Sequence, residues 1–242
     1  MFNDYPFPPE LEVNNLEDIL AVYEKLSKQY GFKVDVPAQV LTIQSDNLME
    51  KRKIVEAKSV LSYILEKYPY SADAYWRLGN LSLRTGHLEE VRDYLRKSLE
   101  ILTDDVGMIK SRLEMVEKRI AGSAAYAIEK VMRNSGFAAS IKKFYELKTD
   151  GVNKLYFDES EFNELGYRLL SCGKVEEAIE IFKLNVEMYS ESANVYDSLA
   201  EAYMRHGDKD LAIENYERSL ELNPENKNAY EMLQRLKNKE KN

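Results

Sequence analysis

The sequence repeats itself at a spacing of 34 residues, and this spacing restricts the possible folds more than any other feature. Residues 159–192 align without a gap on residues 193–226, and residues 38–71 align in the same way on residues 72–105. Within each unit, apolar residues recur every three or four positions, which predicts two amphipathic helices. In three units a glycine that can take a positive φ stands between the helices (Gly86, Gly173 and Gly207). Each unit is therefore expected to be a helical hairpin that stacks on its neighbour to bury its apolar face.

Composition agrees with a packed helical chain. Hydrophobic residues make up 44% of the 242 residues, which is enough to form a core. With only 10 Gly and 6 Pro there are few tight turns, which argues against a sandwich or barrel. The single cysteine, Cys172, excludes a disulfide framework and a four-cysteine zinc site. No apolar run is long enough to span a membrane, and no signal peptide follows Met1, so a cytoplasmic location is expected.

Charge is distributed unevenly along the chain. The formal net charge is −8, but residues 158–226 alone have a net charge of −11, whereas residues 106–157 have +5. A net acidic chain gains nothing from the release of phosphate counterions, so we expect no nucleic-acid partner. The basic stretch is interpreted as solvated helix faces in preference to a binding patch.

The units resemble the tetratricopeptide repeat, whose motif combines aromatic residues, a Leu-Gly pair, small residues and a terminal proline at fixed places. The last unit matches best, with Tyr196, Leu199, Ala200, Tyr203, Gly207, Ala212, Tyr216, Ser219 and Pro224. Residues 159–192 and 72–105 match well, and residues 38–71 match mainly in their second helix. Departures from the motif are Ser45, Ser82, Val91 and Thr103. The resemblance implies an all-α fold, an α-solenoid of tetratricopeptide-type hairpins in two modules with capping helices.

We expect about thirteen helices in four segments. Residues 1–37 are expected to contain an extended stretch at 4–9 and one helix at 16–30, and residues 38–121 two repeats followed by a capping helix. Residues 122–157 are interpreted as a degenerate helical hairpin, and residues 158–242 as two repeats and a C-terminal capping helix. The modules would join near residues 121–123.

A second resemblance concerns the context of the chain. The runs at 165–170, 177–179, 192–199 and 220–224 are similar to the C-terminal, repeat-containing tail of bacterial serine hydrolases, both α/β-hydrolase esterases and β-lactamase-like enzymes. The opening, with Tyr5-Pro6-Phe7-Pro8, is similar to the segment that joins an esterase domain to such a tail. This likeness implies that the chain is an accessory region of a hydrolase whose catalytic domain is not in this sequence.

The chain itself shows no pattern of catalytic residues. A G-x-S-x-G nucleophile elbow is absent, and the S-x-x-K run at 140–143 has no partner motif, so it is interpreted as a helix surface. His87, His206 and Cys172 all flank turn glycines, where a polar side chain in water suffices. The sequence therefore predicts a protein that is not an enzyme, with no catalytic residue, no cofactor and no metal site.

Binding is expected in the concave groove that the first helices of the repeats line. The family resemblance implies that residues 2, 5, 9, 12 and 13 of each 34-residue unit face this groove. The corresponding residues of this chain are Asp73, Trp76, Asn80, Leu83 and Arg84, then Ser160, Asn163, Tyr167, Leu170 and Ser171, and then Asn194, Asp197, Glu201, Met204 and Arg205. Trp76 is either an exposed interface anchor or packed under a neighbouring helix. The carboxylate clamp of chaperone-binding repeats fits poorly, because Trp76 stands where that clamp has lysine.

Two functions from different classes follow. The first is a non-catalytic scaffold that binds a protein or peptide in this groove. The alternative is the hydrolase accessory region, whose partner would be a hydrolase domain.

Overall fold

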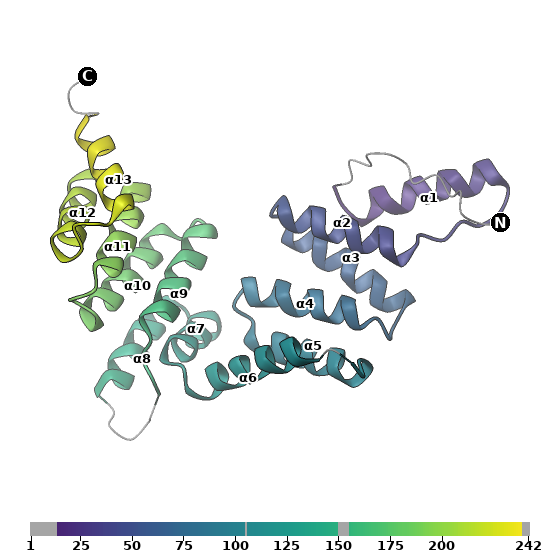
Figure 1. The fold of residues 1–242 in the computed structure, drawn as a ribbon, viewed down its shortest axis with the longest axis horizontal. Coiled ribbons are helices and arrows are strands. Elements are labelled where there is room, and N and C mark those ends of the chain that lie inside the picture. The colour runs from purple at the N-terminus through teal and green to yellow at the C-terminus, as the bar shows by residue number, and fades with distance from the viewer. Residues whose placement is uncertain (1–13, 105, 150–154, 239–242) are drawn as a thin grey trace. The chain divides into compact units, whose positions relative to one another are not determined.

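A computed structural model describes residues 14–104, 106–149 and 155–238. The extended stretch expected at residues 4–9 lies outside the described residues. The described part contains thirteen α-helices and, in place of any strand, a single isolated β-bridge (Figure 1). The all-α fold predicted from the repeat spacing is therefore confirmed.

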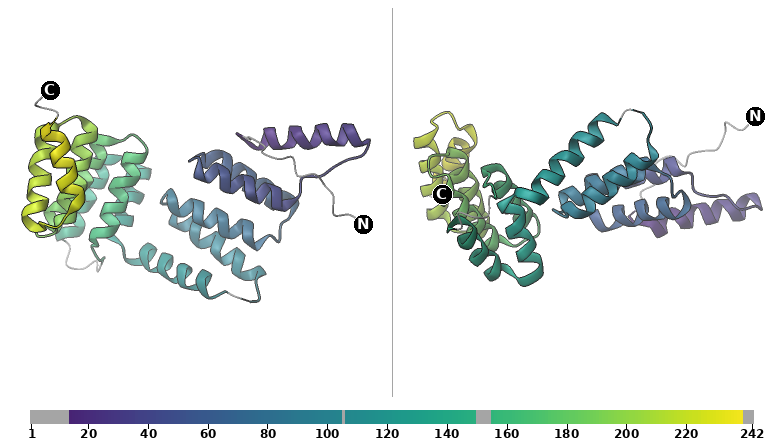
Figure 2. Two further views of the ribbon diagram at one scale, coloured as in Figure 1. Left: turned by 45° about the horizontal axis from the view of Figure 1, so that its top comes forward. Right: turned by 90° about the horizontal axis from the view of Figure 1, so that it is seen from below.

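Each repeat unit forms one helical hairpin, as the spacing predicts. The hairpins are α2 (Ala38–Glu50) with α3 (Ile54–Lys67), α4 (Ala72–Arg84) with α5 (Leu88–Ile101), α9 (Glu159–Ser171) with α10 (Val175–Met188), and α11 (Ala193–His206) with α12 (Lys209–Leu222). The other helices are α1 (Leu16–Tyr30), α6 (Gly107–Gly122), α7 (Ala124–Ser135), α8 (Phe137–Thr149) and α13 (Lys227–Asn238). Successive helices from α9 to α13 lie side by side, as two views show (Figure 2).

The helices form two compact units, Met1–Val116 and Glu117–Asn242. The division falls within α6, a few residues before the join expected near residues 121–123. Each unit has its own hydrophobic core, and each is described here by itself.

The hairpin turns show why the fifteenth residue of the 34-residue unit is usually glycine in this chain. Gly86, Gly173 and Gly207 have φ values of 75°, 75° and 101°, in the region that a residue without a Cβ atom reaches without strain. In the first hairpin the same place holds Arg52, with a φ of 58°. This is the one non-glycine residue with positive φ among the described residues.

In the first unit, α1 packs against α3 and adds Ile19 and Tyr23 to the core. This helix begins at Asn15, whose side chain accepts a hydrogen bond from the backbone N–H of Asp18, and it ends at Gly31 with a φ of 74°. The core continues through α2, α3 and α4 along Leu41, Leu61 and other aliphatic residues of the repeat pattern.

The second core contains a close helix crossing at Gly166. A Cβ atom built on Gly166 would lie 2.5 Å from two ring atoms of Phe182, which is fully buried. Gly166 is the eighth residue of its 34-residue unit and Phe182 the twenty-fourth. Gly79 faces Leu95 at the same two positions of the second unit of the chain.

The chain between α8 and α9 returns to the start of α7. Tyr156 accepts a hydrogen bond from the N–H of Ala124 and donates one to the carbonyl of Gly122, which makes the isolated bridge. Next to it, Phe157 stacks on Phe162 with centroids 5.9 Å apart, and Phe144 meets both rings edge-on. The degenerate hairpin α7–α8 is thereby joined to the repeats that follow it.

Candidate functional site

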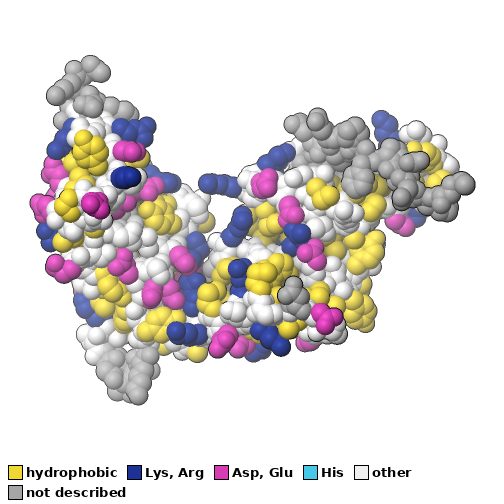
Figure 3. All heavy atoms as spheres, in the orientation of Figure 1, with side chains coloured by type: hydrophobic (Ala, Val, Ile, Leu, Met, Phe, Trp, Pro, Cys, Tyr) yellow, Lys and Arg dark blue, Asp and Glu magenta, His cyan; other side chains and the backbone are white. Residues whose placement is uncertain are grey.

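The groove residues predicted on α4 line one pocket of the first unit. Asp73, Trp76, Asn80 and Arg84 all border a hollow of about 400 Å³. The pocket is completed from α2 by Asp46 and Met49, from α4 itself by Arg77 and Leu83, and from α6 by Arg112. In the space-filling view, basic and hydrophobic side chains lie next to one another in the region of α4 to α6 (Figure 3).

Trp76 is the aromatic wall of this pocket. Its ring is partly exposed and is covered by the guanidinium of Arg112, which lies 4.9 Å from the ring centroid. Arg112 also donates a hydrogen bond to the amide oxygen of Asn80. Trp76 thus borders the pocket and also packs beneath the Arg112 side chain of α6, and its role as an interface anchor stays a prediction.

The charges of the pocket are unequally paired. Arg77, which the groove pattern did not include, donates from Nε to Asp73 at 2.8 Å and also bonds Asp46, so one guanidinium is shared between the two carboxylates. Arg84 is exposed and has no ion-pair partner within the described ranges, and the partners of Arg112 are a neutral amide and a ring. Two arginines thus lie at an aromatic wall without a carboxylate of their own.

The predicted groove residues of the second unit form a hydrogen-bonded network. The Tyr167 hydroxyl on α9 donates to Glu201 Oε2 on α11 at 3.0 Å, and Arg205 donates to Glu201 Oε1 at 2.6 and 3.1 Å. Burial of the phenol, helped by the negative charge of Glu201, raises the pKa of Tyr167 to about 12. These side chains connect neighbouring first helices across the face that they share.

Two asparagines extend the same network. Asn194 donates to Glu159 Oε1 at 2.9 Å, and Asn228 on α13 donates to both carboxylate oxygens of Asp197, at 2.9 and 3.1 Å. Burial raises the pKa of Asp197, and its hydrogen bond from Asn228 opposes that rise. The Oδ1 atom of Asn163 is buried and has no hydrogen-bond partner in the described structure. All fifteen predicted groove residues thus lie on first helices, five of them on α4 at the pocket and ten on α9 and α11.

A cluster of largely buried ion pairs lies between α6, α7 and α9, and the sequence pattern did not predict it. Arg119 on α6 lies 3.2 Å from Glu161 and 3.0 Å from Glu164, both on α9. Glu129 on α7 forms a bidentate pair with Arg168 at 2.7 and 3.2 Å. No signal in the sequence pairs these residues, because the partners are about 40 positions apart and belong to different helices.

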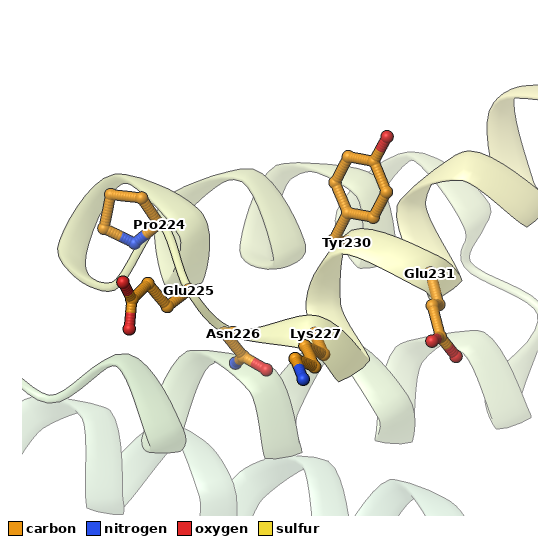
Figure 4. A pocket seen from close by; sticks show the side chains of 6 residues that line it. All are labelled: Pro224, Glu225, Asn226, Lys227, Tyr230 and Glu231. Carbon is orange, nitrogen blue, oxygen red and sulfur yellow. The ribbon is translucent and has the colours of Figure 1, made fainter.

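A second hollow, of about 490 Å³, lies at the turn between α12 and α13 (Figure 4). Its lining includes Pro224, Asn226 and Tyr230, and the Tyr230 ring projects outward from the start of α13. Its charged residues are Glu225, Lys227 and Glu231, so side chains of both signs line the hollow.

The histidines lie at hairpin turns, as expected. His87 Nδ1 is 2.9 Å from the Thr85 hydroxyl, and His206 Nδ1 is 2.8 Å from an Asp208 oxygen. Within the described ranges, no three His, Cys, Asp or Glu side chains are placed to hold a metal ion. Among the same residues, no helix combines the length and the apolar character that crossing a membrane requires.

Comparison with known proteins identifies the repeats. Residues 193–226 and 72–101 each match the tetratricopeptide repeat family. The chain therefore contains tetratricopeptide repeats, and its hairpins have the architecture that this family implies. No significant match was found among curated proteins.

Several solved structures are similar to this chain at low identity and low TM-score. The tetratricopeptide-repeat domain of P58(IPK) is 18% identical with a TM-score of 0.39, and the match covers 92% of this chain and 60% of that one. YrrB, described as having an unusual peptide-binding site, is 15% identical with a TM-score of 0.33, covering 87% and 96%. The TPR2AB domain of yeast Sti1, solved in complex with pHSP90, is 17% identical with a TM-score of 0.33, covering 91% and 90%. The likeness to serine-hydrolase tails rests on sequence alone and stays a prediction.

Proposed function

We propose that the chain is a non-catalytic protein-interaction module and that its first unit binds an extended peptide segment of a partner in the pocket of Trp76. The observation that carries this proposal is the pocket itself, in which an aromatic wall and two arginines without carboxylate partners border one hollow. Tryptophan and arginine are the residues that most often dominate the energy of a protein interface.

The lining indicates which peptide chemistry fits. Met49 and Leu83 add apolar surface beside Trp76, so an apolar side chain of the ligand would be buried there. Arg84 and Arg112 would each gain a charge-assisted hydrogen bond from a carboxylate. We therefore expect a segment that combines an acidic group with a neighbouring apolar side chain.

Selection from a displayed library of random peptides tests this proposal. Peptides that bind the wild-type chain are expected to be rich in Asp or Glu next to apolar residues. Changing both Trp76→Ala and Arg84→Ala should weaken their binding by about thirtyfold or more, since anchors of this kind contribute over about 2 kcal/mol. Lys110→Ala, which removes an exposed cation of α6 outside the pocket lining, is the matched control and should leave affinity unchanged.

Circular dichroism must show equal helicity for all variants. A loss of binding can then be attributed to the changed pocket residues and not to unfolding. Selected peptides that bind the double variant as tightly as the wild type would place the site elsewhere. A library that yields no binder would refute the proposal itself.

The absence of catalysis is part of the same proposal. His87 meets the Thr85 hydroxyl at its own turn, and His206 meets Asp208 at its turn and lies 3.7 Å from Glu176 of α10. A serine hydrolase needs a nucleophile, a base and donors for the oxyanion within reach of one another. Turnover of p-nitrophenyl acetate or nitrocefin that disappears in His87→Ala or His206→Ala would contradict the proposal.

A further inference from the structure

The chain that precedes α1 joins the first unit at a fixed point. Asn14, the first residue of the described part, donates from its backbone N–H to Asp18 Oδ2 at 2.8 Å. Its side-chain oxygen accepts a hydrogen bond from Lys53 Nζ at 2.6 Å. Lys53 stands in the turn between α2 and α3, three residues after α2 ends at Glu50. Residues 1–13 therefore join the described chain beside the C-terminal end of α2.

The same end of α2 borders the pocket of Trp76. Met49 is the second-to-last residue of α2, Arg84 is the last residue of α4, and both line the pocket. Because α2 and α4 are the first helices of successive repeats, their C-terminal ends lie at the same end of the pocket. Lys53 is held close to this end, since its backbone N–H donates to the carbonyl of Leu48 at 2.9 Å. The point where residues 1–13 join the unit is thus next to one end of the pocket.

The charge of this segment is complementary to that of the pocket. Residues 1–13 contain no lysine or arginine and three acidic residues, Asp4, Glu10 and Glu12. The pocket lining contains three arginines and two aspartates, and the two aspartates share Arg77. The acidic residues of the segment also adjoin apolar side chains, Tyr5 and Leu11. The segment therefore combines the acidic and apolar groups that the pocket lining fits.

The segment is also long enough to cover the pocket. An extended chain spans about 3.3 Å per residue, so Phe7 reaches about 23 Å from Asn14, and Asp4 reaches about 33 Å. The part of α4 that borders the pocket, from Asp73 to Arg84, is about 17 Å long. Three prolines within residues 6–9 favour an extended chain, which loses little further conformational entropy when it binds.

We propose that residues 1–13 occupy the pocket of Trp76 in the same chain, with carboxylates on Arg84 and Arg112 and an aromatic side chain of the segment against Trp76. A partner peptide must then displace the chain's own segment before it binds. This inference rests on the proposed function, because it adds regulation to the same pocket.

The covalent connection makes a weak contact effective. A segment attached through a short linker has an effective concentration of about 1 mM. If the free segment bound with a dissociation constant of about 0.1 mM, the attached segment would fill about nine-tenths of the pockets and weaken competing ligands about tenfold. Occupancy by the chain's own segment is therefore measurable as competition.

A synthetic fluorescein-labelled peptide of residues 1–13 is the probe, and its affinity for the full chain is measured by fluorescence anisotropy at about 0.15 M salt, which screens distant charges. Asp4→Asn, Glu10→Gln and Glu12→Gln, made together in the chain, give a released variant that should bind the probe about tenfold more tightly than the wild type. The control removes three charges at exposed positions outside the pocket lining and should change affinity less than twofold: Glu17→Gln, Glu191→Gln and Glu214→Gln.

Pocket substitutions assign the probe to its site. Adding Trp76→Ala and Arg84→Ala to the released variant should weaken probe binding by about thirtyfold or more. Equal affinity of the released variant and the control, or a released variant that does not bind the probe, would overturn the inference. Library peptides that still bind through Trp76 in that case leave the proposed function standing, so the two failures are distinguishable.

Photo-crosslinking tests the same inference in the full chain without a probe. Phe7 is replaced by the photoreactive p-benzoylphenylalanine, and the residue to which it cross-links is identified by mass spectrometry after proteolysis. We expect a cross-link within one chain to a residue that lines the pocket, and we expect Arg84→Ala with Trp76→Ala to reduce its yield. Cross-linked dimers would show that the segment binds a second copy, and cross-links confined to other helices would place it elsewhere. Either result refutes the proposal.

Discussion

Replacing Gly166 by alanine tests whether α9 and α10 cross as closely as the structure shows. The added Cβ atom would lie 2.5 Å from Cε1 and Cζ of Phe182 and 2.9 Å from its Cδ1, so either the ring or a helix must move. Phe182 is fully buried, which leaves the ring little room to turn. Crowding of this kind costs about 1–3 kcal/mol. Three ring atoms lie within 3 Å of the added Cβ atom, so we expect a crowding cost in the upper half of this range, about 2–3 kcal/mol.

Helix propensity acts in the opposite direction. Alanine is favoured over glycine inside a helix by about 1 kcal/mol, so the net loss of stability expected for Gly166→Ala is about 1–2 kcal/mol. In the neighbouring repeat Ala200 and Tyr216 stand at the equivalent positions and both are fully buried, so this hairpin architecture is compatible with a Cβ atom there. The cost should therefore be moderate, and the fold should survive.

Gly79→Ala is the matched control in the other unit. Its Cβ atom would meet Leu95 Cδ2 at 3.3 Å, and that methyl group is the end of a flexible side chain. Here the higher helix propensity of alanine should outweigh the contact with Leu95. The variant should therefore be as stable as the wild type or more stable, by up to about 1 kcal/mol. The two substitutions, identical in chemistry, are expected to differ in sign.

Urea denaturation followed by circular dichroism measures the overall effect, and native-state hydrogen exchange of the affected hairpin measures it locally. Adding Phe182→Leu to Gly166→Ala should recover part of the loss, because the smaller side chain removes the clash. A Gly166→Ala variant as stable as the wild type, with slow exchange in α9 and α10, would refute the close crossing.

Three further outcomes are expected. Arg52→Gly should stabilise the first unit by about 0.5–1 kcal/mol in urea, since relief of left-handed backbone strain exceeds the entropy that glycine adds to the unfolded chain; a destabilised variant would show that the arginine side chain contributes to the turn. Ala212→Leu should cost about 1–3 kcal/mol because Ala212 is fully buried, and an unchanged denaturation midpoint would contradict a tight contact there. Burial raises the pKa of Asp197, so the wild type loses stability as pH rises above the ordinary aspartate pKa of about 4. Asp197→Asn should therefore gain on the wild type as pH rises above about 4, and parallel pH profiles of stability would exclude the shift.

The repeat pattern predicted the helices well because the signals for helix, turn and close crossing recur at fixed places. Gly86, Gly173 and Gly207 mark the turns of three hairpins, and each indeed has a positive φ. The groove positions implied by the family resemblance include Trp76 and Asn80, and both line the pocket. Residues four apart on a helix lie on the same face, which is consistent with this placement.

What the sequence could not supply are contacts between side chains of different helices. Arg112 was predicted only as part of a capping helix, yet its position on Trp76 decides how much of the ring is open. The pairing of Arg119 with Glu161 is equally invisible, because periodicity fixes the face of each helix but not which side chains meet across two faces. The positive φ of Arg52 could not be predicted for another reason. The geometry of a turn can override the general preference of a non-glycine residue for negative φ.

The position of Trp76 also has a practical consequence. It is the sole tryptophan in a chain with 17 tyrosines. Fluorescence excited at wavelengths that only indole absorbs therefore reports on the first unit and contains no signal from the second. The emission colour of an indole depends on the charge and water around its ring, and here a guanidinium lies 4.9 Å away. A ligand that draws Arg112 from the ring would change that emission, so the pocket contains its own optical reporter of occupancy and needs no attached dye.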